Sequence, residues 1–383
     1  MTQSFLLQLP TKIYYGCGEL ANVSERIKEI GGKRVLIVTD DTVNKTVYMQ
    51  RLLKSLKRNG INVIVYDKVI PNPAVKHVEE GITLGQEYGC DLIIGFGGGS
   101  SLDCAKAIAL MMSNEGKISD YWGSPPANKS MPLIAIPTTA GTSSEITWVT
   151  VIKDETKKVK MGIASPKLAP IMAIYDPEVT ISVPPDLTAS IGMDTLTHAI
   201  ESYINKKKNP VTDLVALEAI RLIGENLRTA VVDGNNINAR HGMLLATLYA
   251  GIAFANTGLG IVHAITAVLG GVFPVSHGIV NAILLPPCMK FNMESSIEKF
   301  SNIAMVMGEK VDGLFADDAA VRAVEAVSRL SMDVGIPNKL RDVGVKKALL
   351  EDVVDEAMKN VNIAVNPRQP NKDDLLKICL QVI

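Results

Sequence analysis

Short apolar runs alternate with amphipathic stretches through the first half of the chain. Four runs rich in Ile, Val and Leu predict buried strands, at residues 34–40, 61–67, 91–97 and 132–139. Apolar residues at helical spacing between these runs predict helices, over residues 43–60, 74–89 and 101–112. Because strands that alternate with helices form a parallel sheet covered on both faces, this half predicts a Rossmann-like α/β domain.

The pattern changes near Pro184 and Pro185, beyond which strand-like runs become scarce. Long helical patterns follow, over residues 186–204, 211–231, 238–256 and 318–335. We therefore expect two domains: a dinucleotide-binding α/β domain over residues 1–183 and an all-α, metal-binding domain over residues 184–383. A length of 383 residues also favours two cores over one.

Composition and charge exclude several classes of protein. The chain is 47% hydrophobic and 21% charged with a net charge of −1, so we expect an ordinary enzyme with no nucleic-acid partner. The apolar stretch at 258–275 is interrupted by His263, Gly270 and Gly271, so no membrane span is expected. The five cysteines lie far apart without a CxxC pair, which favours a reducing cytoplasm.

A glycine-rich loop joins the third predicted strand to the helix after it, in GFGGGSSLDCAK (95–106). Glycines allow a close approach to a pyrophosphate, and the free N–H groups of the helix start favour anions. The loop lacks the full GxGxxG spacing, so a tight strand-to-helix turn is the alternative interpretation.

Asp40 ends the first predicted strand, where a carboxylate can bind a ribose diol and repel a 2′-phosphate. This favours NAD over NADP, although a lone aspartate is more often a turn or cap residue. Hydroxyls crowd the end of the fourth strand in TTAGTSSE (138–145), where they suit phosphate or nicotinamide contacts.

The five histidines include a set compatible with a metal ion. Asp194 and His198 are four residues apart in a helical pattern and so share one helix face. His263 lies in an apolar segment, and His277 follows a turn. Three imidazoles and a carboxylate suit a divalent first-row metal. Spacing alone leaves buried structural histidines equally open, and it groups neither His77 nor His241 with a second candidate ligand.

The chain resembles the iron-containing (group III) alcohol dehydrogenases over essentially its whole length. The resemblance rests on eight strings: IVTD (37–40), PNP (71–73), GGGSSLDCAKAIA (97–109), PTTAGTSSE (137–145), GMDTLTHAIESY (192–203), GLGIVHA (258–264), HGIVNAILLP (277–286) and NPR (366–368). It implies metal ligation by Asp194, His198, His263 and His277, with Fe²⁺ expected first and Zn²⁺ or Mn²⁺ as alternatives. The cofactor contacts that it implies are Asp40, Asn72, Gly97, Gly98, Gly99, Ser100, Ser101, Thr138, Thr139, Thr142, Thr147 and Lys160.

Two departures from the family pattern affect the expected substrate pocket. The family usually has a histidine four residues after the third ligand, where this chain has Ala267, and Trp148 stands where an arginine is common. The absent histidine puts the usual proton route in doubt. The pocket residues that the resemblance suggests are Val149, Phe254, Ala267 and Asn362.

These features predict an NAD(H)-dependent oxidoreductase acting on the CH–OH group of a small primary alcohol, or reducing the matching aldehyde. The candidates are 1,3-propanediol, lactaldehyde, ethanol and sulfoacetaldehyde, and the enzyme is expected to be a homodimer or larger homo-oligomer. Two alternatives stay open at this point: a lyase of the dehydroquinate-synthase type, and a protein that binds NAD and metal without turnover.

Overall fold

The computed structural model describes residues 4–157, 159–273 and 275–383 and divides into two compact units. The first unit, called the sheet unit below, is Leu9–Ser182. The second, called the helical unit, joins the described residues before Leu9 to Val183–Ile383.

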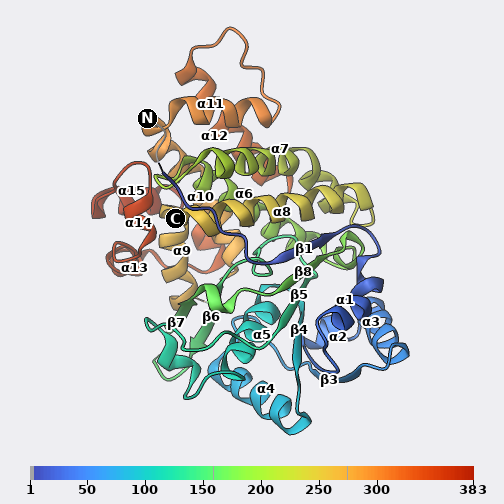
Figure 1. Ribbon diagram of the computed structural model, residues 1–383. Helices are drawn as coiled ribbons and strands as arrows, with labels where there is room; N and C mark the ends of the chain where they lie inside the picture. The colour runs from blue at the N-terminus through green and yellow to red at the C-terminus, as the bar shows by residue number, and fades with distance from the viewer. Residues whose placement is uncertain (1–3, 158, 274) are drawn as a thin grey trace. The chain divides into compact units, whose positions relative to one another are not determined.

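A six-stranded parallel sheet forms the centre of the sheet unit, in the order β1-β8-β5-β4-β2-β3 (Figure 1). Its strands are β1 (Lys12–Tyr15), β2 (Arg34–Val38), β3 (Asn62–Tyr66), β4 (Leu92–Gly97), β5 (Leu133–Pro137) and β8 (Met172–Tyr175). The four predicted strands correspond to β2, β3, β4 and β5. Strands β1 and β8 were not predicted.

Helices cover both faces of this sheet: α1 (Val23–Glu29), α2 (Asp41–Asn44), α3 (Val47–Arg58), α4 (Val75–Tyr88) and α5 (Gly99–Met111). Alternate side chains of β2 show the two faces. Val35 and Ile37 pack with residues of α1 and α3, whereas Leu36 and Val38 pack with residues of α4 and α5. Because both faces are buried, the strands are continuous apolar runs, which is why the sequence reveals them.

The predicted helix over residues 43–60 is interrupted in the structure. Helix α2 ends at Asn44 and α3 begins at Val47. The hydroxyl oxygen of Thr46 accepts a hydrogen bond from the backbone N–H of Met49 at 3.2 Å and so caps α3. Because Thr46 caps a new helix start, the chain forms α2 and α3 where one continuous helix was predicted.

The sheet unit also contains an antiparallel hairpin, of β6 (Val149–Asp154) and β7 (Val159–Ala164). Ile152, Met161 and Ile163 from this hairpin join the core on the α4 and α5 side of the main sheet. Short 3₁₀ turns connect elements of both units: Glu19–Asn22, Ile118–Tyr121, Pro166–Leu168, Pro177–Thr180, Met293–Ser295, Leu340–Val343 and Lys347–Leu349.

The described part of the helical unit contains no strand. Its helices are α6 (Pro185–Ile204), α7 (Pro210–Val232), α8 (Ile237–Thr257), α9 (Ile261–Val272), α10 (His277–Asn292), α11 (Ile297–Val306), α12 (Ala316–Asp333), α13 (Leu350–Ala357), α14 (Asn362–Val365) and α15 (Lys372–Gln381). Helix α6 packs against α7, α8 and α10, and its residues are buried almost without interruption from Thr188 to Ile204. The predicted fold class, an α/β domain followed by an all-helical one, is confirmed.

Within the described residues, no single helix is long and apolar enough to cross a membrane. Helices α8 and α9 reach that length and composition only as a pair, and they are bent by 97° relative to one another.

Candidate metal centre and nucleotide-binding loop

The candidate metal centre begins on α6 of the helical unit. Asp194 and His198 lie one helical turn apart, and their side chains are only 5% and 7% exposed. His198 Nε2 lies 3.9 Å from Asp194 Oδ1. Two polar groups that are buried this deeply require a partner, because their desolvation is costly.

His263 and His277 bring their imidazoles to the same carboxylate oxygen from two other helices. His263 Nε2 lies 3.7 Å from Asp194 Oδ1, and His277 Nε2 lies 3.9 Å from it. Ligand atoms of Asp194, His263 and His277 all lie within 4.8 Å of one another, while the ring of His198 stacks on that of His263 at 4.6 Å. Three helices therefore contribute to one cluster.

The distances suit a first-row metal ion. In a tetrahedral site with ligands about 2.0–2.2 Å from the ion, the ligand atoms lie about 3.3–3.6 Å apart. The separations from Asp194 Oδ1, 3.7–3.9 Å, exceed this by a few tenths of an ångström. The buried amide of Asn281 also has its Nδ2 at 2.6 Å from Asp194 Oδ1 and 3.1 Å from His263 Nε2, while its Oδ1 has no partner among the described residues. The amide nitrogen also lies 3.2 Å from His277 Nε2, so acceptor atoms of three residues converge on one donor, and such a convergence of acceptors fits a bound cation.

A close approach between helices places His277 in this cluster. Helix α10 starts at His277, and the Ser276 hydroxyl before it lies 3.0 Å from that of Ser190 on α6. A Cβ at Gly278 would lie 2.3 Å from the backbone oxygen of Ser190. Only glycine at this position lets the start of α10 lie so near α6.

The electrostatics of the cluster favour a carboxylate anion. Burial alone would raise the pKa of Asp194, but His198 and His277, together with His263, hold it well below its usual value. Burial by itself would lower the pKa of His263, yet Asp194 and Glu201 raise it to about 9. The cluster is thus a negatively charged, buried position that attracts a proton or a metal cation.

The glycine-rich loop lies at the junction of β4 and α5 in the sheet unit. Helix α5 runs from Gly99 to Met111, and its N-cap Gly98 provides no side chain. A Cβ at Gly99 would lie 2.7 Å from the Thr142 side chain. Thr142 therefore packs so closely that only glycine fits at position 99, and the backbone N–H groups at such a helix start favour an anion.

Asp40 combines the two roles considered for it. Its Oδ1 accepts a hydrogen bond from Val43 N at 2.9 Å and caps α2, while its Oδ2 accepts one from Ser101 Oγ at 3.4 Å. Asp40 therefore lies beside the glycine-rich loop. Asn72 is exposed and has a positive φ of 56°, a strained conformation that is more frequent at functional sites than elsewhere.

The predicted threonines follow β5, next to the loop. Thr138 N donates to Gly97 O at 3.0 Å, and a Cβ at Gly98 would lie 3.4 Å from the Thr139 side chain. Thr147 Oγ1 accepts a hydrogen bond from the buried ammonium of Lys106 at 3.4 Å. Lys160 lies on β7, where burial, with the nearby Lys153, lowers its pKa. The structure thus gathers the loop, Asp40, Thr138, Thr139 and Thr142 near the carboxyl ends of β2, β4 and β5.

The predicted pocket residues belong to both units. Phe254 stacks on the ring of His198, with 4.6 Å between ring centroids, so it lies beside the metal cluster. Ala267 is exposed on α9, one turn after His263. Asn362 Oδ1 accepts a hydrogen bond from Leu259 N at 3.3 Å, and Val149 begins β6 of the sheet unit. A common substrate pocket for these four remains a prediction.

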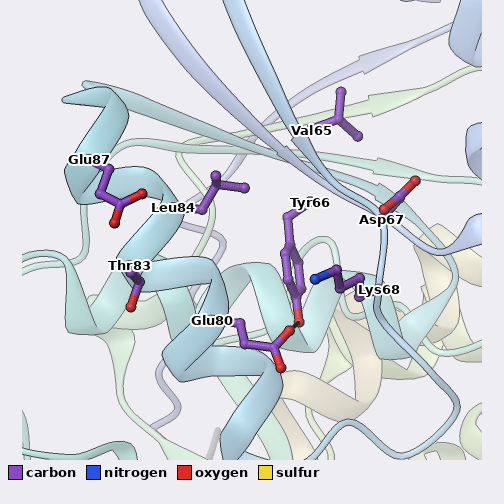
Figure 2. Close-up of a pocket in the computed structure, with 8 residues that line it drawn as sticks. All are labelled: Val65, Tyr66, Asp67, Lys68, Glu80, Thr83, Leu84 and Glu87. Carbon is purple, nitrogen blue, oxygen red and sulfur yellow. Dashed lines mark hydrogen bonds between the residues drawn. The ribbon is translucent and has the colours of Figure 1, made fainter.

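A separate pocket of about 440 Å³ opens in the sheet unit between the end of β3 and α4 (Figure 2). Tyr66 Oη donates a hydrogen bond to Glu80 Oε2 at 3.0 Å across it, and Lys68 lies at its side. None of the predicted cofactor residues lines this pocket.

Comparisons with known proteins place the whole chain in one family. The model described as iron-containing alcohol dehydrogenase matches residues 10–177, and the one described as Fe-containing alcohol dehydrogenase family, C-terminal, matches residues 188–383. The chain belongs to the iron-containing alcohol dehydrogenase family. It is 43% identical to the 1,3-propanediol dehydrogenase of Citrobacter freundii, with 97% of each chain covered.

Two further relatives support this assignment over the full length. The NAD-dependent methanol dehydrogenase of Bacillus methanolicus is 41% identical, with 99% of each chain covered. A solved structure described as 1,3-propanediol oxidoreductase matches with a TM-score of 0.97 and 42% identity, over 100% of both chains. The predicted family, oxidoreductase class, and NAD and metal dependence are confirmed at the level of the family. The two alternatives to a dehydrogenase find no support in these comparisons.

Two residues of the metal cluster were not predicted from the sequence, Glu201 and Asn281. Glu201 is seven residues after Asp194, and Asn281 is four after His277, so each shares a helix face with a predicted ligand. The strings GMDTLTHAIESY and HGIVNAILLP contain both spacings. These spacings are the signal that could have identified Glu201 and Asn281.

Proposed function

We propose that this member of the family oxidises a small, uncharged primary alcohol with NAD and reduces the matching aldehyde, with 1,3-propanediol first among its substrates. The observation that carries the proposal is the convergence of Asp194, His263 and His277, beside His198 and the ring of Phe254. The 43% identity to a 1,3-propanediol dehydrogenase supports the choice of substrate.

The proposal gives the ligand role to Asp194, His198, His263 and His277. A bound divalent ion supplies a Lewis acid for the substrate oxygen, and NAD supplies the hydride acceptor. The residues of the chain position these groups. Phe254 gives an apolar wall beside His198, which suits a substrate with a short carbon chain and excludes water from one side of the cluster.

For NAD, the proposal assigns the pyrophosphate to the loop Gly97, Gly98, Gly99, Ser100 and Ser101, and the adenosine ribose to Asp40. Supporting contacts come from Asn72, Thr138, Thr139, Thr142, Thr147 and Lys160. The bond between Asp40 and Ser101 supports this assignment, because it holds the carboxylate next to the loop.

The test is an assay of NADH at 340 nm after anaerobic loading with Fe²⁺, Zn²⁺ or Mn²⁺ separately. The panel contains 1,3-propanediol, ethanol, lactaldehyde and sulfoacetaldehyde, and the Asp194→Ala variant is the control. We expect turnover that needs a metal, that Asp194→Ala abolishes, and that is highest with 1,3-propanediol. A metal-loaded protein that turns over none of the panel overturns the activity, and highest turnover with the charged aldehyde overturns the substrate class.

We further propose that the enzyme is a cytoplasmic homodimer or larger homo-oligomer. The edge strands β1 and β3 each pair with one strand only, so the sheet offers two edges for another copy. The described structure contains five free cysteines, in keeping with a reducing compartment. Light scattering on the purified protein tests the oligomer, since a monomer mass near 41.2 kDa contradicts it.

A further inference from the structure

Helix α6 carries a third acidic or imidazole side chain on the face that bears Asp194 and His198. Glu201 follows them at the next helical turn, and its side chain is 3% exposed. Among the described residues it forms no ion pair with a lysine or arginine; its ion-pair partner is His263. Burying a carboxylate without such a cation is expensive, so the position calls for a specific reason.

Both oxygens of Glu201 accept hydrogen bonds from α9. Oε2 lies 2.6 Å from His263 Nδ1, and Oε1 accepts the backbone N–H of Val262 at 2.7 Å. His263 Nε2 lies 3.1 Å from Asn281 Nδ2, an amide nitrogen that can only donate, and 3.7 Å from Asp194 Oδ1, so the carboxylate of Glu201 meets the ring at Nδ1 alone. Each carboxylate oxygen of Glu201 thus contacts a different group of α9.

The start of α9 is built closely around this carboxylate. A Cβ at Gly260 would lie 2.7 Å from Glu201 Oε1 and 2.9 Å from Asn366 Oδ1. Asn366 Oδ1 also accepts the N–H of Ile261 at 3.4 Å, so two acceptors share the first N–H groups of the helix. A negative charge at a helix N-terminus is favourable, which offsets part of the cost of burying Glu201.

We propose that Glu201 is a positioning residue that keeps the proton of His263 on Nδ1 and leaves the Nε2 lone pair for the metal ion. A metal-binding histidine needs its other ring nitrogen to donate to an acceptor, which fixes its tautomer and orientation. A carboxylate is required because Val262 N–H and His263 Nδ1–H use two different oxygens. The inference rests on the metal site proposed above.

The deciding variant is Glu201→Gln, which is nearly isosteric but has a single acceptor oxygen. Its amide nitrogen must face either Val262 N–H or His263 Nδ1, and a donor at Nδ1 favours the tautomer with the proton on Nε2. We expect Co²⁺ affinity, measured by competition with a chromophoric chelator, to fall about 10–100-fold. The visible d–d spectrum of the remaining Co²⁺ complex should change as well.

Two control variants separate this role from a purely structural one. Asn366→Ala removes the other acceptor at the start of α9 without touching His263, so its Co²⁺ spectrum should match the wild type. Asp213→Asn makes the same carboxylate-to-amide change at an ion pair with Lys299 that includes none of the four proposed ligands, and it should leave Co²⁺ affinity unchanged. If Glu201 only holds the helix, Glu201→Gln and Asn366→Ala will shift the spectrum alike, and the inference fails.

A measurement on the wild type covers the case in which Glu201→Gln does not fold. With only five histidines, ¹⁵N-histidine NMR of the Zn²⁺-loaded protein resolves the tautomers, and loss of a signal in His263→Asn assigns it. We expect a protonated Nδ1 for His263, and a proton on Nε2 overturns the inference. A wild type that binds neither Co²⁺ nor Zn²⁺ refutes the proposed function instead, so the two failures are distinguishable.

Discussion

Gly278→Ala offers a severe test of the proposed metal centre, because it changes no ligand. A Cβ at this position would lie 2.3 Å from the backbone oxygen of Ser190, whereas real Cβ contacts stay above 3.0 Å. The backbone oxygen cannot rotate away as a side chain could. The start of α10 must therefore retreat from α6 by about 0.7 Å, the difference between these distances.

His277 is the residue before Gly278 and moves with it, whereas metal–ligand distances tolerate only about 0.2 Å. We expect Gly278→Ala to lower Zn²⁺ affinity by at least the roughly 10–100-fold that indirect changes at metal sites cost. Overpacking should also lower the free energy of unfolding by about 1–3 kcal/mol. Chelator competition measures the first quantity and urea unfolding of the metal-free protein the second.

The matched control is Gly271→Ala in α9, where a Cβ meets nothing within 4 Å. This change should leave Zn²⁺ affinity unaltered and slightly stabilise the helix, by up to about 1 kcal/mol. The reasoning is wrong if Gly278→Ala binds Zn²⁺ as tightly as Gly271→Ala and unfolds at the same urea concentration.

Three further predictions address the cofactor, the proton route and pH. Asp40→Asn keeps an N-cap acceptor for Val43 but removes the charge, so the ratio of kcat/KM for NADP to that for NAD should rise roughly tenfold; an unchanged ratio contradicts the ribose assignment. Ala267→His should retain the metal and add an ionisation at pH about 6.5 to the pH–rate profile, and an identical profile argues against a proton route at this position. Burial raises the pKa of Glu145 to about 7 from 4.5, so the folded state loses stability as pH rises between these values. Glu145→Gln should abolish this loss, which amounts to up to about 3 kcal/mol of the free energy of unfolding. Urea unfolding of the wild type and the variant at pH 4.5 and 8 measures it. If the free energy of unfolding changes equally between the two pH values in both proteins, Glu145 is not the group responsible.

The sequence predicted three of the four inner strands because their surroundings leave a simple trace; the fourth, β8, is equally buried but has only four residues and was missed. β2, β4 and β5 are buried on both faces and so consist of uninterrupted apolar residues. β1 has only four partly exposed residues, and β6 alternates buried with exposed ones beside polar side chains, so neither stands out from loops. The interruption between α2 and α3 was missed because it depends on a single cap, Thr46.

The candidate site was predictable to a similar, limited extent. The spacing of Asp194 and His198 indicates a shared helix face, but nothing in a local pattern shows that α10 meets α6 through Gly278. Residue types alone left His263 and His277 open between a metal site and buried structural histidines, and the resemblance to a family favoured the metal site. Glu201 and Asn281 were missed because a glutamate or asparagine on a helix is usually a solvated or structural residue.

The proposed ligand atoms belong to α6, α9 and α10, which are separate in the chain. An ion held by all of them would act as a crosslink, so the heat resistance of the helical unit would depend on the free metal concentration. The sheet unit has no share in that crosslink. Starvation for metal would therefore loosen one half of the polypeptide selectively and expose it to proteases, which couples the lifetime of the enzyme to the metal supply of the cell.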